Sequence, residues 1–237
     1  MNDATSAIAP PRDSPLGFRS FAREMARTAL WSVKPPPFPA EALPRGHGRT
    51  VLLIPGFLTG DWAMSRLRGF LRSLDYRAEM SGTALNLGPT RGLAERLDAK
   101  LATLSARDGA ISLIGQSLGG VMARALAHGR PGCVSSVITL CTPVRFPVAT
   151  PLEPFVRLFA PLHDPAWIAR RHSIAEPLPV PLTAIYSETD GIVDWRQCLV
   201  EETGDQRNLR VDGVHSVMGS NPEAQRAIAH ALARVSA

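Results

Sequence analysis

One serine of this chain lies in a pattern that could make it a nucleophile. The apolar run ISLI over residues 111–114 leads directly into GQSLG over residues 115–119, and a helical pattern follows at once. An apolar stretch before Gly-x-Ser-x-Gly and a helix after it are typical of a nucleophile elbow, a tight strand-to-helix turn that exposes the serine hydroxyl. We therefore predict that Ser117 is a nucleophile at the end of a buried strand.

A serine hydroxyl is a poor nucleophile near neutral pH, so it needs a base to take its proton and an acid to orient that base. His215 suits the role of base because it follows the last predicted strand and precedes the final predicted helix. That place in the chain fits the order serine, acid, histidine that accompanies such elbows. The other histidines lie before the first predicted strand, in predicted helices or in a proline-rich segment: His47, His128, His163, His172 and His230.

The acid is expected after a strand between the serine and the histidine, and the segment 186–194 offers three carboxylates there. Asp190 comes directly after the predicted strand and is followed by Gly191, which permits a turn. Asp194 stays open as the alternative, although its position suits the cap of the next helix. We expect Glu188 to point elsewhere. Asp190 is therefore the predicted triad acid.

Two backbone N–H groups are needed to stabilise the oxyanion that forms when the serine attacks a carbonyl group. One should come from Leu118, the residue after the nucleophile. The other should come from Phe57, in the loop after the first predicted strand, where Gly56 lets the backbone bend toward Ser117. The side chains of Phe57 and Leu58 would also line an apolar pocket for an acyl group.

The elements that must position these residues alternate along the chain. Apolar runs predict strands over 50–54, 76–80, 110–115, 134–140, 182–187 and 208–211. Helical periodicity or capping residues predict helices over 16–33, 61–74, 93–104, 118–128, 195–201 and 221–235. Strands that alternate with helices indicate an α/β fold, with a mostly parallel sheet and helices on both faces.

Two segments stand apart from this alternation. Residues 1–45 predict an N-terminal extension with one helix, ahead of a catalytic domain over 46–237. Residues 143–181 are rich in proline and aromatic residues and lie between two predicted strands. A connection of this length is often a lid over a functional site. It is equally consistent with an ordinary crossover that holds one helix over 152–159 and another over 166–171, and both interpretations stay open.

The composition excludes several classes of function. The net charge is +5, and all but two of the 26 basic residues are arginines, which are scattered without a basic block, so we expect no nucleic-acid partner. No window approaches a membrane span, and the N-terminus does not resemble a secretory signal, so we expect a cytoplasmic protein. The chain has an odd number of cysteines, Cys133, Cys141 and Cys198, and we expect all three to be reduced. No metal-ligand or phosphate-binding motif occurs, so no metal and no cofactor are expected.

The motifs taken together resemble those of the α/β-hydrolase family, and within it those of small bacterial lipases and esterases. The resemblance rests on IPGF over 54–57, GQSLG over 115–119, YSETDGIV over 186–193 and VH over 214–215, and covers about residues 49–235. It implies the α/β-hydrolase fold, with the triad and the oxyanion donors at the residues already singled out: Ser117, Asp190, His215, Phe57 and Leu118.

The chain departs from that family in two places. Many relatives carry His-Gly where this chain has Pro55-Gly56, which removes a side chain that helps to order the loop. Ser187 stands where the acid-bearing turn usually has glycine, as in some small lipases. The segment 86–90 also resembles a loop of lipase-like members, without a role that the sequence assigns.

These observations favour a serine hydrolase that cleaves carboxylic esters through an acyl-enzyme on Ser117, as an esterase or lipase of lipid metabolism. The expected partner is a small-molecule ester with a hydrophobic acyl group. An acyltransferase would use the same triad, and a non-catalytic ligand-binding module could be built on the same fold. The natural ester, its chain length and the oligomeric state are not encoded in any motif.

Overall fold

A computed structural model describes residues 16–34, 36–39, 42–169 and 174–236, and six strands in this part of the chain form one parallel sheet. Their order in the sheet is β2-β1-β3-β4-β5-β6, so the chain crosses between the strands through helices. The strands are β1 (Thr50–Ile54), β2 (Arg77–Met80), β3 (Ile111–Gln116), β4 (Val134–Leu140), β5 (Leu182–Tyr186) and β6 (Gln206–Arg210).

The part of the chain that the structure describes holds seven α-helices and six short 3₁₀ turns. The α-helices are α1 (Phe18–Val33), α2 (Ser65–Ser73), α3 (Arg91–Asp108), α4 (Leu118–Gly129), α5 (Glu153–Phe159), α6 (Pro165–Ala169) and α7 (Pro222–Ala233). Shorter 3₁₀ turns are η1 (Asp61–Met64), η2 (Pro131–Cys133), η3 (Ala160–Leu162), η4 (Trp195–Cys198), η5 (His215–Ser220) and η6 (Arg234–Ser236).

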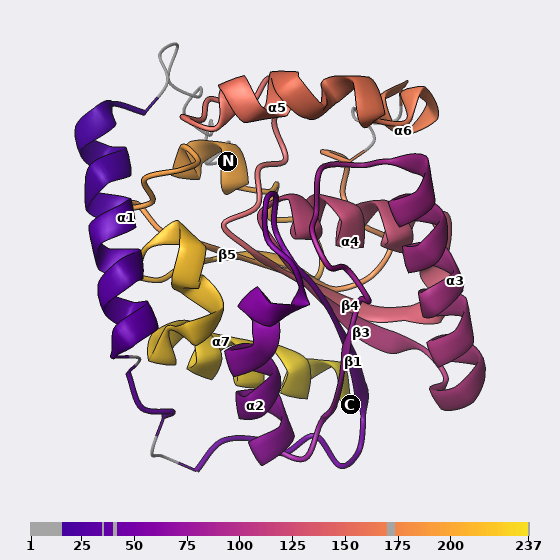
Figure 1. The fold of residues 1–237 in the computed structure, drawn as a ribbon. Helices are drawn as coiled ribbons and strands as arrows, with labels where there is room; N and C mark the ends of the chain where they lie inside the picture. Colours follow the sequence, from indigo (N-terminus) through magenta and orange to yellow (C-terminus); the bar gives the residue numbers. More distant parts are fainter. Residues whose placement is uncertain (1–15, 35, 40–41, 170–173, 237) are drawn as a thin grey trace, which may run out of the picture.

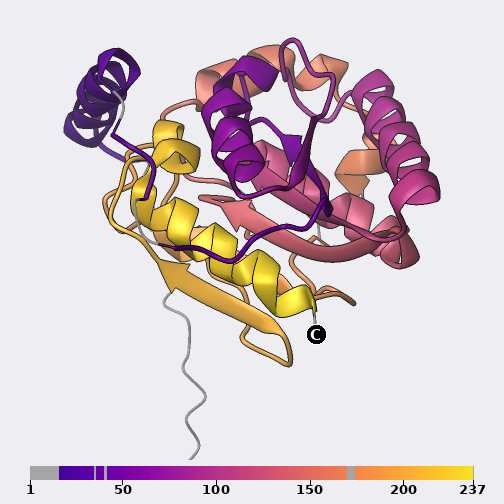
Figure 2. The same ribbon diagram turned by 90° about the horizontal axis from the view of Figure 1, so that it is seen from below.

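Both faces of the sheet are buried, as the near-continuous apolar strands require. Side chains alternate along each strand, so Val51 and Leu53 of β1 join a core with α2 and α7, whereas Leu52 and Ile54 join a core with α3 and α4. Figure 1 and Figure 2 show these helix pairs on opposite sides of the sheet. The predicted α/β fold with a parallel sheet is confirmed.

The parallel arrangement places all the candidate residues at one edge. Phe57 follows β1, Ser117 follows β3, Asp190 follows β5 and His215 follows β6. Because parallel strands end at the same edge of their sheet, these loops meet there, which is the edge where open α/β sheets bind their ligands.

The two segments outside the alternation lie at the periphery. α1 runs along one side of the molecule, and α5 and α6 cross the top of the view in Figure 1. The predicted helices over 152–159 and 166–171 correspond to α5 and α6, while residues 170–173, including His172, lie outside the described residues, as does the predicted extension before residue 16.

Two predicted helices differ from those observed. The helix predicted over 61–74 is divided into η1 and α2, and the one predicted over 195–201 is a single 3₁₀ turn, η4. A 3₁₀ turn is the usual form of so short a piece. Among the described residues, no helix is both long and apolar enough to cross a membrane.

Candidate active site

Ser117 sits in a strained turn between a strand and a helix. β3 ends at Gln116 and α4 begins at Leu118, so Ser117 alone makes the change of direction. Its φ of 52° and ψ of −123° are unusual for a residue with a side chain. Its N–H donates to the carbonyl oxygen of Leu140 at 2.8 Å. The geometry is that of the elbow that the sequence predicts.

The glycines of the motif are required by close packing around this turn. A Cβ atom on Gly115 would lie 2.3 Å from the carbonyl oxygen of Gly119, and one on Gly119 would lie 2.2 Å from that of Ile54. Neither position has room for a side chain, so β1, β3 and α4 can approach this closely only with glycine at both sites.

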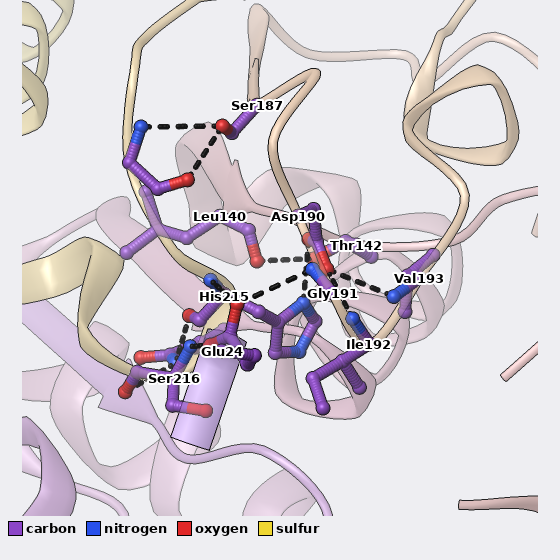
Figure 3. A network of polar contacts seen from close by, with 12 residues as sticks. Glu24, Leu140, Thr142, Ser187, Asp190, Gly191, Ile192, Val193, His215 and Ser216 are labelled. Atoms are coloured by element: carbon purple, nitrogen blue, oxygen red, sulfur yellow. Dashed lines mark hydrogen bonds and ion pairs between the residues drawn. The ribbon is translucent and has the colours of Figure 1, made fainter. Parts of the chain in front are cut away.

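His215 and Asp190 form a buried hydrogen-bonded pair. His215 Nδ1 lies 2.7 Å from Asp190 Oδ2, and the two residues are 5% and 6% exposed. Asp190 Oδ1 accepts from the N–H groups of Ile192, at 2.7 Å, and Val193, at 2.9 Å. Figure 3 shows the carboxylate held between these amides and the imidazole. Each oxygen of Asp190 thus has its own partner.

Asp194, the alternative acid, has a different task. Its Oδ1 accepts from the N–H of Arg196 at 3.2 Å, which caps η4, and lies 3.4 Å from the Arg196 guanidinium. This is the capping role that its position suggested. The structure therefore brings Asp190 to His215 and directs Asp194 to η4.

The loops that carry the histidine and the acid are held by two side chains, Gln116 and Ser187, to which the sequence assigned no such role. Gln116 donates through Nε2 to the carbonyl oxygens of His215, at 3.0 Å, and Ser216, at 3.2 Å. The Ser187 hydroxyl donates to the carbonyl oxygen of Gly213 at 2.7 Å and accepts from its N–H at 3.2 Å. The position of Gln116 beside the nucleophile was a signal that could have marked it.

The loop after β1 lies against the elbow. A Cβ atom on Gly56 would lie 3.2 Å from the carbonyl oxygen of Gln116 and 3.2 Å from Ser117 Cβ. Within the part of the chain that the structure describes, the N–H groups of Phe57 and Leu118 have no hydrogen-bond acceptor. Both N–H groups are thus free to bind a ligand atom, and their role as an oxyanion hole stays a prediction.

Asn86, in the segment 86–90, holds the loop that follows β1 in place. Its buried side-chain amide donates to the carbonyl oxygen of Pro55 at 2.9 Å, and its backbone carbonyl accepts from the N–H of Leu58 at 2.8 Å. Its Oδ1 accepts from the N–H of Gly88 at 3.0 Å. These bonds order the Pro55-Gly56 loop. A buried asparagine is not visible as such in one sequence.

A pocket of about 340 Å³ opens beside Ser117. Its lining is mainly apolar and includes Phe57, Leu118, Phe146, Val156, Trp167 and Ile192. Two charged residues, Glu153 and Arg157, also line the pocket. They form an ion pair with each other, with 2.6 Å between Arg157 Nη2 and Glu153 Oε1. Leu58 does not line this pocket, so its predicted contact with an acyl group gains no support here.

Comparisons with known proteins agree with this architecture. No protein-family model matches the sequence, and no curated protein matches it significantly. Solved structures match over most of the chain at low identity, and three of them represent the set. One belongs to the metagenome-derived lipolytic enzymes LipS and LipT, with a TM-score of 0.60 at 14% identity, covering 80% of this chain and 96% of that one.

The other two are a monoacylglycerol lipase of Paleococcus ferrophilus and a thioesterase domain from the curacin biosynthetic pathway. The lipase has a TM-score of 0.54 at 16% identity, covering 82% of this chain and all of that one. The thioesterase domain has a TM-score of 0.54 at 16% identity, covering 81% and 93%. The chain has the α/β-hydrolase fold. At these identities the likeness concerns the fold alone, because one fold hosts many chemistries.

The charges around His215 in this α/β-hydrolase fold favour its protonated form. Burial lowers the pKa of the imidazole, but the charge of Asp190, the hydrogen bond to Asp190 and the charge of Glu24 outweigh burial, so the pKa of His215 is raised. A histidine whose pKa is raised holds its proton more firmly, so the imidazolium form of His215 is stabilised at this position.

The raised pKa predicts the pH dependence of any reaction that uses His215 as a base. Neutral His215 is needed, so kcat/KM should fall as the pH drops through the pKa of His215, at a pH above the usual histidine value of about 6.5. A pH profile of kcat/KM with an ester substrate checks this. An acid limb centred below that usual value would contradict the prediction.

Cys141 completes a cluster with the pair, since one ligand atom each of Cys141, Asp190 and His215 lie within 4.8 Å of one another. Such a cluster could suggest a metal site, but the residues fit one poorly. A metal-ligating cysteine must be a thiolate, whereas burial raises the pKa of the Cys141 thiol far above its usual range, and the charge of Asp190 raises it further. His215 and Asp190 are moreover bonded to each other rather than open to an ion.

Proposed function

We propose that this protein is a serine hydrolase that cleaves carboxylic esters, with Ser117, His215 and Asp190 as its catalytic triad. The observation that carries the proposal is the buried 2.7 Å hydrogen bond between His215 Nδ1 and Asp190 Oδ2, on loops tied to the strained turn that presents Ser117. The lipases and thioesterase that share the fold support the same class of chemistry.

The first half of the reaction forms an acyl-enzyme. Ser117 Oγ attacks the ester carbonyl carbon while His215 takes the hydroxyl proton, and the negative charge that develops on the carbonyl oxygen is stabilised by the N–H groups of Phe57 and Leu118. The ester C–O bond then breaks, and His215 passes its proton to the departing alcohol. Asp190 keeps Nδ1 protonated, so that Nε2 is free to accept the proton from the serine.

The second half releases the acid. A water molecule gives a proton to His215 and attacks the acyl carbon, and the bond to Ser117 Oγ breaks as the proton returns to the serine. The carboxylic acid leaves and the enzyme is restored. All the groups involved belong to the chain itself, so the cycle is complete with water as the co-substrate.

The apolar pocket sets the class of substrate. A volume of about 340 Å³ lies at the small end of the range for small-molecule sites, about 300–1,000 Å³, and its lining suits a hydrophobic acyl group of short or medium length. Phe146, Val156 and Trp167 of the 143–181 segment contribute to that lining. Phe159 contacts Phe57 edge-on, with 6.2 Å between ring centroids. We accordingly interpret this segment as the cover of the substrate pocket.

A fluorophosphonate probe tests the nucleophile, and a series of esters tests the pocket. The probe is expected to label Ser117, as located by peptide mass spectrometry, because only an activated serine reacts with it. Among p-nitrophenyl esters of increasing chain length, kcat/KM should peak at short or medium chains and fall for long ones. Heat-unfolded protein provides the control for non-specific labelling.

Two outcomes would count against the proposal. Absence of labelling together with absence of ester turnover would favour a non-catalytic binding module on this fold. Predominant transfer of the acyl group to an added alcohol, measured in the products at equal turnover, would favour an acyltransferase that uses the same triad.

A further inference from the structure

Glu24 is a buried carboxylate on α1, outside the part of the chain that resembles the α/β-hydrolase family. It is 1% exposed, although the residues before and after it on the helix are exposed. Burying a carboxylate is costly unless hydrogen bonds replace its hydration. Its partners therefore show why the helix carries it.

The carboxylate binds the backbone of both loops that hold the catalytic pair. Glu24 Oε2 accepts from the N–H of His215 at 3.0 Å and from that of Gly191, the residue after Asp190, at 3.2 Å. Glu24 Oε1 accepts from the N–H of Ser216 at 2.8 Å. Figure 3 shows Glu24 beside the Asp190–His215 pair. One side chain thus links the acid loop to the histidine loop.

The helix is packed too closely on the acid loop for this contact to be incidental. A Cβ atom on Gly191 would lie 2.5 Å from the carbonyl oxygen of Ser20 and 2.7 Å from Glu24 Cβ. Phe21, on the same face of α1, packs against a small cluster that contains Ile192 and Val193. The backbone of the acid loop is therefore in direct contact with α1.

Glu24 also contributes charge. The titratable groups that face His215 are Asp190, Glu24 and Cys141, and Cys141 stays a neutral thiol because burial raises its pKa. Although burial alone would lower the pKa of His215, the charge of Glu24 adds to the stronger effect of Asp190 in raising it. A second carboxylate near the imidazolium would stabilise it as the reaction proceeds.

We infer that Glu24 is a positioning residue of the active site, which holds the acid loop and the histidine loop in register and adds negative charge beside His215. The inference rests on the proposed function, because it assigns a role relative to the triad. It also makes α1 a functional part of the enzyme rather than an appendage to the catalytic domain.

The variant Glu24→Gln tests the inference. A glutamine keeps the shape but has a single acceptor oxygen, so its NH₂ group would face at least one of the backbone N–H groups and the loops would separate. We expect kcat/KM for a p-nitrophenyl ester to fall by about 100-fold, as for other small displacements of catalytic groups. We also expect the acid limb of the pH profile to move to lower pH, because a charge that raises the pKa of His215 is lost.

Glu201→Gln is the matched control, because it makes the same change at an exposed glutamate. It should leave both kcat/KM and the acid limb unchanged. An E24Q protein with wild-type kcat/KM would overturn the inference. A lower kcat/KM with an unmoved acid limb would also overturn it, because a purely structural role would give that result.

A second variant decides the question if E24Q does not fold. Gly191→Ala keeps the carboxylate, but its new methyl group would push α1 away from the acid loop. We expect kcat/KM to fall at least about tenfold, whereas Gly132→Ala, where nothing lies within 4 Å of the added atom, should have no effect. Wild-type kcat/KM in G191A would overturn the inference, and an inactive, unlabelled wild-type protein would instead overturn the proposed function with it.

Discussion

Replacing Ser117 with alanine is expected to lower kcat for p-nitrophenyl esters by about 10⁴- to 10⁶-fold, because the proposed acyl-enzyme would then not form and only the remaining groups of the site would assist water. The hydroxyl is exposed to the pocket by a backbone turn that alanine can also adopt at the same cost in strain. The loss should therefore concern chemistry rather than folding. Steady-state kinetics and fluorophosphonate labelling measure it.

The control for this experiment is Ser65→Ala, a change at an exposed serine whose hydroxyl donates to the carbonyl oxygen of Trp62 at 2.7 Å. It should keep full turnover. Both variants should have a thermal unfolding midpoint within a few degrees of the wild-type value, because neither substitution removes a buried contact. Turnover in S117A close to that of the wild type would exclude Ser117 as the nucleophile.

The second large effect is expected for Asp190→Asn. Oδ1 of Asp190 accepts from two backbone N–H groups, so the oxygen of an asparagine would stay on them and its NH₂ group would face His215. His215 Nδ1 would then have to accept that hydrogen bond, which places the ring proton on Nε2, where it cannot take the proton of Ser117. We expect kcat to fall by about 10⁴-fold while the fold is preserved.

Asp194→Asn separates this effect from a general loss of charge in the same loop. The asparagine oxygen can still cap η4 by accepting from the N–H of Arg196. We expect kcat to stay within about threefold of the wild-type value, because the substitution keeps this cap and leaves the bond between Asp190 and His215 in place. If D194N lost as much activity as D190N, the assignment of Asp190 as the triad acid would fail. The same pair of kinetic measurements therefore tests both carboxylates.

The positions of strands and helices could be predicted because their signals are local. The strand predicted over 134–140 is β4 with the same bounds, and the helix predicted over 118–128 is α4 with one residue more. Asn221 caps α7 by accepting from the N–H of Glu223 at 2.8 Å, at the start of the helix predicted over 221–235. Such signals depend on apolar periodicity and on turn residues that act within a few positions of the chain.

The choice between Asp190 and Asp194 shows where local signals end. Asp190 and Asp194 follow the same strand and are four residues apart. Each is followed by backbone N–H groups from which a carboxylate can accept hydrogen bonds. Only the path of the backbone after β5 decides which one faces His215. That path depends on ties such as the one from Ser187 to Gly213, which join residues far apart in the chain.

The sequence by itself therefore determined the α/β fold, the strained turn at Ser117 and the order of the three candidate catalytic residues, because glycine spacing and apolar runs encode them locally. The tertiary structure alone decided which polar residues support the site. Asn86 holds the loop after β1, and Glu24 reaches backbone groups near residue 215, almost the whole chain away. A buried polar residue is recognised only by its partners, and packing alone brings those partners together.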